Sequence, residues 1–377
     1  MRCNRFLEFR VRIRLKPGAA PGSFYPWESP RAGTTMIEKT AAVPRAAGWL
    51  LAAVLAVAQA GGGQARGEFQ IVGKVLRGDG KPFTGAVPVV FVDGAFAPFA
   101  LRVYAEKSGD FRIRGLNPGT YNLSVFVPGA GEWRRTIEVG PGTADAKGIV
   151  RVEARLAPDF SQDDAHVVSA AELSVPAEAK RLYLKAEQQL GKMDVAGAAA
   201  SLRKAVEIAP RFAAAWNRLG IIAYQSRKYD EAEELFRKAL EQEPGSFPPL
   251  VNLGGALLSL GRFGESREVN LRAARMKPDD PLAQSQLGMS YFMLGEYDRA
   301  EAALRHAKTL DPGHFTLPQL LLADIYEHRN NLEAAVLELE SFLKLHPDSP
   351  RAPEVRARLD GLRKARAGAK PGGTHQK

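Results

Sequence analysis

Residues 213–246 read AAAWNRLGIIAYQSRKYDEAEELFRKALEQEPGS, and this stretch decides the fold of the second half of the chain. Small side chains stand at Gly220, Ala232 and Ala239, and Pro244 closes the stretch. Two antiparallel helices cross closely only where both carry small side chains, and a proline cannot extend the helix that it follows. The stretch is therefore expected to form a pair of helices.

The same pattern returns at a spacing of 34 residues. The units are 179–212, 213–246, 247–280, 281–314 and, after the extra residue Phe315, 316–349. One helix pair cannot bury its apolar face alone, so stacked pairs must supply the core, and five units suffice for this. The repeat predicts an all-α superhelix, or α-solenoid, over 179–349. Val355, Leu359 and Leu362 on one helical face predict a capping helix over 350–365.

The preceding segment, 68–157, has the sequence pattern of an all-β domain. Runs rich in β-branched and aromatic residues alternate with turn signals, and the expected strands are 69–76, 86–92, 101–105, 111–113, 121–127, 133–139 and 149–156. Phe111 and Ile113 alternate with Arg112 and Arg114, so successive side chains should face a core and water in turn. About seven short strands in ninety residues predict an immunoglobulin-like sandwich.

The N-terminal region has the form of an export signal. Residues 46–58 are apolar but span only about 20 Å, which is too short for a hydrocarbon core of ~30 Å, and Ala58-Gln59-Ala60 follows them. We interpret 36–60 as a signal peptide, with a buried apolar helix or an uncleaved anchor as the alternatives. Met36 is then the expected start and 1–35 an over-extended N-terminus, although Met1 remains open.

This interpretation predicts a bacterial periplasmic or extracellular protein with no stable membrane span after cleavage. The single cysteine, Cys3, lies in the expected discarded part, so disulfides and thiol chemistry are not expected in the mature chain. Residues 158–178 are expected to be a linker, and 366–377 a basic, disordered tail.

The net charge of +10 comes from the two ends of the chain. Segments 1–60 and 362–377 carry surpluses of six and five positive charges, which leaves −1 for residues 61–361. A nucleic-acid-binding domain should carry a basic face on its folded part. No nucleic-acid partner is therefore expected.

The motif GDFRIRGLNPGTYNL at 109–123 resembles the carboxypeptidase regulatory-like domain. This resemblance implies a transthyretin-like, or prealbumin-like, sandwich without catalytic residues. Related sandwiches sometimes bind glycans, and Trp133, Tyr104 and Phe96 could stack on a sugar or pack in the core. Arg77-Gly78-Asp79 matches an integrin-binding tripeptide, but a tight turn is the favoured interpretation.

The helical units resemble the tetratricopeptide repeat, and the second unit matches it nearly throughout. The resemblance implies a concave groove that binds a protein or peptide segment. The groove lacks the Lys, Arg and Asn set that clamps acidic C-termini in some members, so no preference for a free carboxylate end is expected. The implied groove residues are Tyr183, Leu190, Asn217, Ile221, Tyr224, Gln225, Val251, Leu258, Ser259, Met289, Phe292, Met293, Leu320, Asp324 and Glu327.

No catalytic, cofactor-binding or metal-binding constellation stands out in the sequence. The six histidines show no HExxH motif and no paired metal spacing, and no phosphate loop is present. The leading hypothesis is an exported, non-enzymatic interaction scaffold without a cofactor. The alternative is carbohydrate or envelope-glycan binding through the sandwich.

Overall fold

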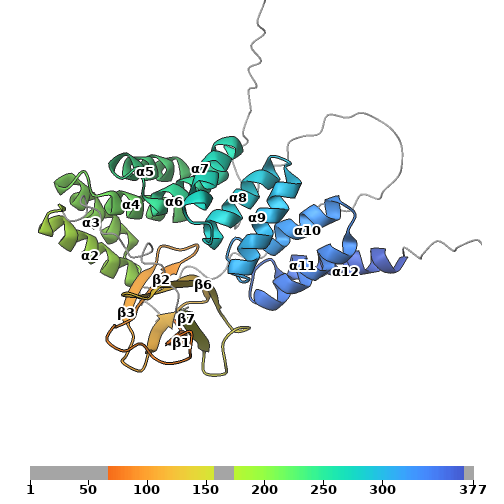
Figure 1. Cartoon of the computed structure of the whole chain (residues 1–377), viewed down its shortest axis with the longest axis horizontal. Helices are drawn as coiled ribbons and strands as arrows, with labels where there is room; N and C mark the ends of the chain where they lie inside the picture. Colours follow the sequence, from red (N-terminus) through yellow and green to blue (C-terminus); the bar gives the residue numbers. More distant parts are fainter. Residues whose placement is uncertain (1–66, 157–173, 369–377) are drawn as a thin grey trace, which may run out of the picture.

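The computed structural model describes residues 67–156 and 174–368, which form a β-sandwich and a helical array (Figure 1). The expectations for 1–35, for the signal peptide at 36–60, for most of the linker and for the end of the tail lie outside the described residues. Within the described part, no helix combines the length and the apolar character that crossing a membrane requires.

The sandwich consists of two sheets, with strand orders β4-β1-β7 and β3-β2-β5-β6. Phe111 and Ile113 are buried while Arg112 and Arg114 are exposed, as the alternation predicted. The buried side chains of both sheets form one core that includes Ile71. The strands are β1 (Phe69–Arg77), β2 (Val89–Gly94), β3 (Ala100–Tyr104), β4 (Asp110–Leu116), β5 (Gly119–Val127), β6 (Gly131–Val139) and β7 (Ile149–Leu156).

Two details of the sandwich differ from the expectation or refine it. β2 begins at Val89 and not at Ala86, because Pro88 has no N–H for the sheet. The Arg77-Gly78-Asp79 tripeptide forms a tight turn after β1, where the Gly80 amide donates to the Arg77 carbonyl at 2.9 Å. Gly80 has a φ of 80°, a conformation that glycine adopts readily.

The second part is a stack of helix pairs followed by a final helix. Each expected unit contains two helices, although the first helix begins two residues before 179, and the final helix extends beyond 365. The helices are α2 (Ala177–Gly191), α3 (Val195–Ile208), α4 (Ala213–Gln225), α5 (Tyr229–Gln242), α6 (Phe247–Ser259), α7 (Phe263–Met276), α8 (Pro281–Met293), α9 (Tyr297–Leu310), α10 (Pro318–His328), α11 (Leu332–Leu345) and α12 (Ala352–Gly368).

The small residues lie where the paired helices cross. A Cβ at Gly220 would lie 2.5 Å from the ring of Phe236, and a Cβ at Gly288 would lie 2.7 Å from Leu304. The turn inside each pair also repeats, because one residue in each turn adopts a left-handed conformation with φ between 56° and 76°. These turn residues are Met193, Arg227, Gly261, Gly295 and Asn330, spaced by 34 residues until Phe315 adds one.

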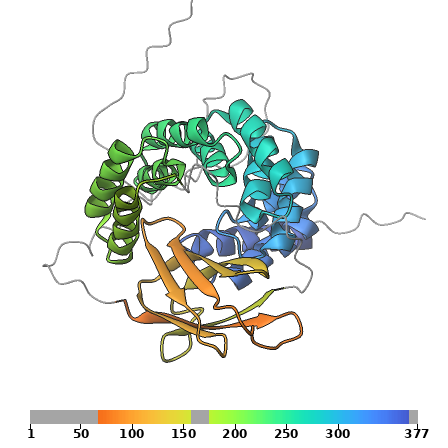
Figure 2. The same ribbon diagram turned by 60° about the vertical axis from the view of Figure 1, so that its left-hand side comes forward.

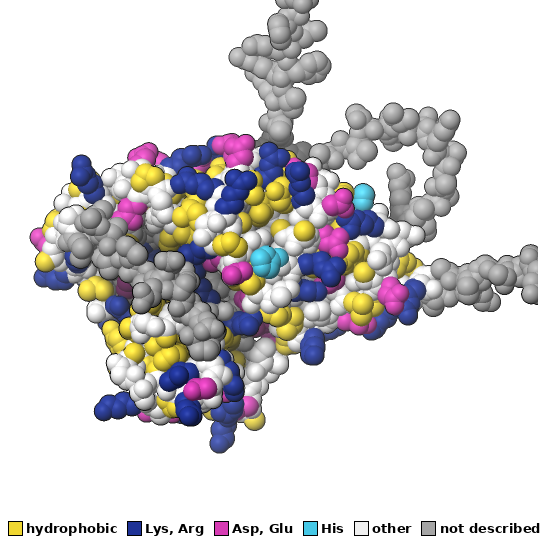
Figure 3. Space-filling model, viewed as in Figure 1, with side chains coloured by type: hydrophobic (Ala, Val, Ile, Leu, Met, Phe, Trp, Pro, Cys, Tyr) yellow, Lys and Arg dark blue, Asp and Glu magenta, His cyan; other side chains and the backbone are white. Residues whose placement is uncertain are grey.

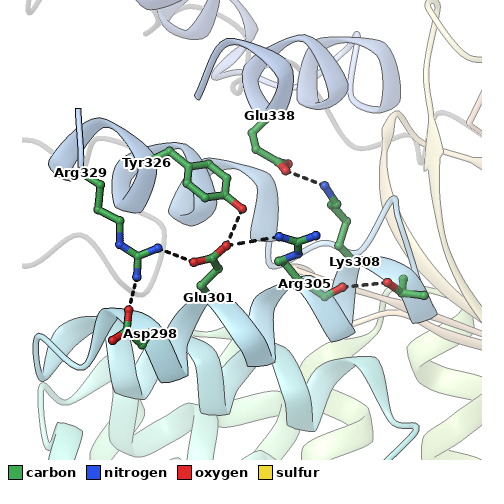
Figure 4. Close-up of polar contacts among 8 residues, drawn as sticks. Asp298, Glu301, Arg305, Lys308, Tyr326, Arg329 and Glu338 are labelled. Carbon is green, nitrogen blue, oxygen red and sulfur yellow. Dashed lines mark hydrogen bonds and ion pairs between the residues drawn. The ribbon is translucent and has the colours of Figure 1, made fainter. Parts of the chain in front are cut away.

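Ion pairs join neighbouring units of the array. Glu301 of α9 accepts hydrogen bonds from Arg329, from Tyr326 of α10 and from Arg305, and Arg329 also reaches Asp298 (Figure 4). Burial opposes the charge on Glu301, but these hydrogen bonds hold its pKa below the usual range. The network therefore favours the stacked arrangement of the fourth and fifth units at neutral pH.

The array curves around an opening, and the sandwich closes one side of it (Figure 2). The outer face of the β3-β2-β5-β6 sheet lies against the inner helices of the array, as the pairs Arg218–Asp93 and Arg134–Asp280 show. On the face shown in Figure 3, basic and acidic side chains are interspersed over the array. The sandwich thus occupies part of the concave face that the repeat pattern left for a partner.

Candidate functional site

The concave face of the array and the outer face of the sheet enclose a cavity of about 430 Å³, here called the main cavity. Its helical wall comes from the inner helices α4, α6 and α8. Its opposite wall comes from β2, β5 and β6. The main lining residues are Asp93, Asn122, Ser124, Arg134, Thr136, Asn217, Ile221, Tyr224, Gln225, Val251, Asn252, Gly255 and Gln286.

Eight of the groove residues expected from the sequence line this region. Asn217, Ile221, Tyr224, Gln225 and Val251 line the main cavity. Three more, Leu258, Ser259 and Met289, line a neighbouring cavity of about 50 Å³, here called the loop cavity because Ala95 and Phe96 of the β2–β3 loop also line it.

The remaining expected residues have other surroundings. Leu190 and Leu320 are buried between helices, and Tyr183 packs against Phe212 with the ring centroids 5.3 Å apart. Their large apolar surfaces contribute to the stacking of units.

At the far end of the array, Phe292 packs against Tyr297 and Met293 is half-buried. Asp324 and Glu327 are bound by Arg358 of the capping helix, which neutralises the acidic end of the groove. The structure therefore concentrates the accessible groove on α4, α6 and α8.

One end of the sandwich is fixed to the array through β2. Arg218 Nη1 of α4 donates to Asp93 Oδ1 at 3.0 Å, and Nη2 donates to Glu187 Oε2 of α2 at 3.2 Å. The Gln225 side-chain amide donates to the Gly94 carbonyl at 2.8 Å. Gln225, an expected partner contact, is thus engaged by the chain's own strand β2.

The other end is fixed through β6 and the loop that follows it. The Thr136 backbone amide donates to Asp311 Oδ2 at 3.0 Å, and Arg135 Nη1 donates to the Leu310 carbonyl at 2.9 Å. The Gly142 amide donates to both carboxylate oxygens of Asp348. Because β6 is the edge of its sheet, the bond to Asp311 satisfies a strand amide, that of Thr136, with which no further strand pairs.

The charges at the boundary of the cavity are paired. Burial alone would lower the pKa of Arg218, but Asp93, Tyr183 and Glu187 raise it above the ordinary value. Arg134 is bound by Glu132 and Asp280, and Arg135 lies 3.7 Å from Asp311. These arginines therefore join the two domains, and they offer no unpaired positive charge to an anionic ligand.

Neutral polar groups form much of the inner surface. Asn252 donates to Asn217 at 3.0 Å, and Ser259 donates to the Tyr224 hydroxyl at 3.2 Å. Burial raises the pKa of Tyr224 to about 12, so its hydroxyl stays protonated. Gln286 is only 8% exposed, and its Oε1 has no hydrogen-bond partner among the described residues. Amides and hydroxyls both donate and accept, which suits a polypeptide main chain.

The three aromatic residues considered for sugar stacking do not form one platform. Trp133 packs against the sandwich core. Phe96 contacts Phe315 of the array, and Tyr104 is exposed at the end of β3. The described residues also contain no group of three or more His, Cys, Asp or Glu side chains placed to hold a metal ion.

Sequence reasoning missed the residues that join the two domains. Arg218 follows the expected groove residue Asn217, but nothing in the pattern showed that Asp93 would face it. Phe315 was the one available signal, because it interrupts the 34-residue spacing, and the structure places it against Phe96.

Comparison with protein families is consistent with this architecture. Family models of the tetratricopeptide repeat match residues 183–247, 223–289, 281–314 and 319–349. The model of the carboxypeptidase regulatory-like domain matches residues 70–151. The chain therefore carries multiple tetratricopeptide repeats behind an N-terminal carboxypeptidase regulatory-like domain, as the motifs predicted. Such repeats support a protein–protein interaction scaffold.

Individual relatives match only part of this chain. The chain is 28% identical over 142 residues to the Hsp70-Hsp90 organising protein of Plasmodium falciparum, covering 35% of this chain and 56% of the relative. It is 29% identical over 133 residues to the anaphase-promoting complex subunit CDC16 of Saccharomyces cerevisiae, covering 34% of this chain and 16% of the relative. The chain thus spans little more than half of the first relative and much less of the second.

Solved structures with similar folds include YrrB, described as a TPR protein with an unusual peptide-binding site. It has 23% sequence identity and a TM-score of 0.41, and the match covers 51% of this chain and all of YrrB. The PilF protein of Pseudomonas aeruginosa has 22% identity and a TM-score of 0.44, with 51% of this chain and 87% of PilF covered.

Proposed function

We propose that this protein is an exported, non-enzymatic scaffold that binds an extended segment of a partner protein in the main cavity. The observation that carries the proposal is the mixture of apolar and neutral polar side chains on the helical wall of the main cavity. Ile221 and Val251 offer apolar contact on the helical wall, while Asn217, Asn252 and Gln286 offer donors and acceptors for a main chain. An extended segment needs both kinds of contact along its length.

The paired charges favour a neutral segment over an acidic one. Bringing an unpaired carboxylate into this cavity would require desolvation without a free cation to compensate. The sandwich adds a second wall through Asn122 and Ser124 of β5, so a bound segment contacts both domains. A partner with a neutral, extended stretch of polypeptide fits these surroundings best.

Site-specific photo-crosslinking tests this proposal. A photoreactive phenylalanine analogue at Ile221 reports on the main cavity, and the same analogue at Arg237, exposed on the outer helix α5, is the matched control. Crosslinks to one defined partner segment from position 221 and not from position 237 support the proposal. Equal crosslinking from both positions, or crosslinking from position 237 alone, contradicts it.

Export is part of the same proposal and needs its own measurement. The proposal of export is based on the apolar run at 46–58 and on Ala58-Gln59-Ala60, which follows it. Expression in a bacterial host, fractionation and N-terminal sequencing should find a mature chain that begins after Ala60 outside the cytoplasm. A cytoplasmic protein with residues 36–60 still attached would refute export.

A further inference from the structure

The β2–β3 loop, residues 95–99, lies on the concave face where a partner is expected. Gly94, at the end of β2, accepts a hydrogen bond from the Gln225 side chain at 2.8 Å. Ala95 and Phe96 line the loop cavity together with Leu258 and Met289. The end of β2 therefore gives a main-chain carbonyl to α4, and the loop places an aromatic side chain beside the inner helices, as a short bound peptide would.

Phe96 makes its aromatic contact with the residue that interrupts the repeat. The Phe96 and Phe315 rings meet edge to face, with centroids 5.8 Å apart and an interplanar angle of 84°. Such a contact contributes about 0.5–1.5 kcal/mol beyond the area that it buries. The insertion of Phe315 before the fifth unit thus creates an aromatic contact that a strict 34-residue spacing would not provide.

The β2–β3 loop does not fill the space beside the inner helices completely. Phe96 remains 43% exposed, and the loop cavity of about 50 Å³ persists beside it. Gln286 borders both the loop cavity and the main cavity. Its Oε1, which has no hydrogen-bond partner among the described residues, needs an N–H donor that the loop does not supply. A longer segment could fill the space and donate to Gln286.

Phe315 also lies where the cavities meet. It lines the main cavity, the loop cavity and a third cavity of about 260 Å³ beside the fifth unit, here called the end cavity. Phe96 lines the last two of these. A segment that displaced Phe96 would therefore have continuous access along the concave face, from α4 to the start of α10.

We infer that the concave face binds a neutral partner segment whose aromatic side chain replaces Phe96 against Phe315, and that the β2–β3 loop is a built-in competitor for this place. The inference rests on the proposed function and specifies the partner's chemistry: an aromatic residue within an extended main chain that donates an N–H to Gln286. The contacts of Thr136 and Gly142 lie elsewhere on the sandwich, so the partner displaces the loop while the sandwich stays docked.

The test uses the full chain and a labelled peptide with the sequence of residues 94–100, GAFAPFA. Fluorescence anisotropy measures its affinity for the wild type and for Phe96→Ala, with Tyr104→Ala as a control for an exposed aromatic residue of the same domain. An attached loop competes at an effective concentration in the millimolar range. Phe96→Ala should therefore bind the peptide at least tenfold more tightly than the wild type, whereas Tyr104→Ala should match the wild type.

A second variant shows where the peptide binds. Adding Phe315→Ala to Phe96→Ala should weaken binding at least tenfold, and hydrogen exchange of the Thr136 amide should stay as slow as in the wild type, which shows that the sandwich is still docked. Unchanged affinity in Phe96→Ala, or binding that ignores Phe315→Ala, overturns the inference. Dimerisation of Phe96→Ala in sedimentation, without peptide binding, also overturns it by assigning the place to a second copy.

Failure of this inference is distinguishable from failure of the proposed function. If the labelled peptide does not bind but a partner still crosslinks from position 221, the main cavity keeps its role and only the loop-competitor assignment is lost. If the peptide binds as expected but no partner crosslinks from position 221, the binding site for an aromatic side chain at Phe315 is supported. The proposed path of the segment through the main cavity is then wrong.

Discussion

Asp93 is the carboxylate through which β2 is held to the array, so Asp93→Ala should loosen the docking of the sandwich. Its Oδ1 lies 3.0 Å from Arg218 Nη1, and the two side chains are 37% and 17% exposed. Opposite unit charges about 4 Å apart interact by ~1 kcal/mol in water and by ~4 kcal/mol near a protein surface. Because Asp93 is more than a third exposed, we expect a loss near the lower end, about 1.5 kcal/mol.

Native-state hydrogen exchange measures this loss directly. The Thr136 amide lies on an edge strand and donates to Asp311 of the array, so the described structure protects it only while the domains are docked. Asp93, Asn122 and Thr136 face one another across three strands of the same sheet, which couples them. A loss of about 1.5 kcal/mol corresponds to roughly tenfold faster exchange of the Thr136 amide.

The control is Glu234→Ala, which removes an exposed carboxylate that binds Lys238 within α5. Exposed pairs of this kind contribute little to stability because water screens them, so the Thr136 amide should exchange as in the wild type. If Asp93→Ala leaves Thr136 exchange unchanged while its global stability is also unchanged, the sandwich is not held to the array through Arg218, and the reasoning is refuted.

Three further predictions concern stability, each read out by urea unfolding. Gly220→Ala should cost about 1–3 kcal/mol because the new Cβ would lie 2.5 Å from the Phe236 ring; a neutral change would show that the crossing is loose. Glu301→Gln should cost about 1–2 kcal/mol at pH 7 by weakening the bond to Arg329. The pKa of Glu301 is lowered in the fold, so this difference should shrink as the pH falls below the ordinary value of 4.5 and vanish below the lowered pKa; a difference that does not shrink on acidification contradicts it. Burial lowers the pKa of His314 to about 3. As the pH falls below 6.5, this histidine therefore takes up a proton only in the unfolded chain, and stability should fall by roughly 2 kcal/mol between pH 7 and pH 5. His314→Asn should remove this dependence of stability on pH, and an unchanged dependence would assign it to another group.

The sequence predicts the helical architecture well because the repeat places small residues where helices must cross. Each unit carries its small residues at the same places, and the helices therefore cross with Gly220 against Phe236 and Gly288 against Leu304. The sandwich strands follow from alternation in the same way. The predicted start of β2, at Ala86, was too early. The apolar run there outweighed the signal of Pro88, which has no N–H for the sheet, and the strand begins at Val89.

The docking of the two domains could not be predicted from the same patterns. Asp93 and Asn122 alternate with buried residues on their strands, and such a pattern indicates a face that contacts water or any other polar surface. Nothing local distinguishes these possibilities. Eight of the expected groove residues, on α4, α6 and α8, therefore line cavities, while the second wall of the main cavity and the loop beside it could not be predicted.

The most direct test of the account is hydrogen exchange on the full chain with and without its bound segment. We predict slower exchange in α4, α6 and α8, and faster exchange of the Ala95 amide, which donates to the Thr120 carbonyl while the loop is seated. The Thr136 amide should stay protected. Slower exchange confined to the outer helices α5, α7 and α9, with the Ala95 amide unaffected, would contradict binding on the concave face.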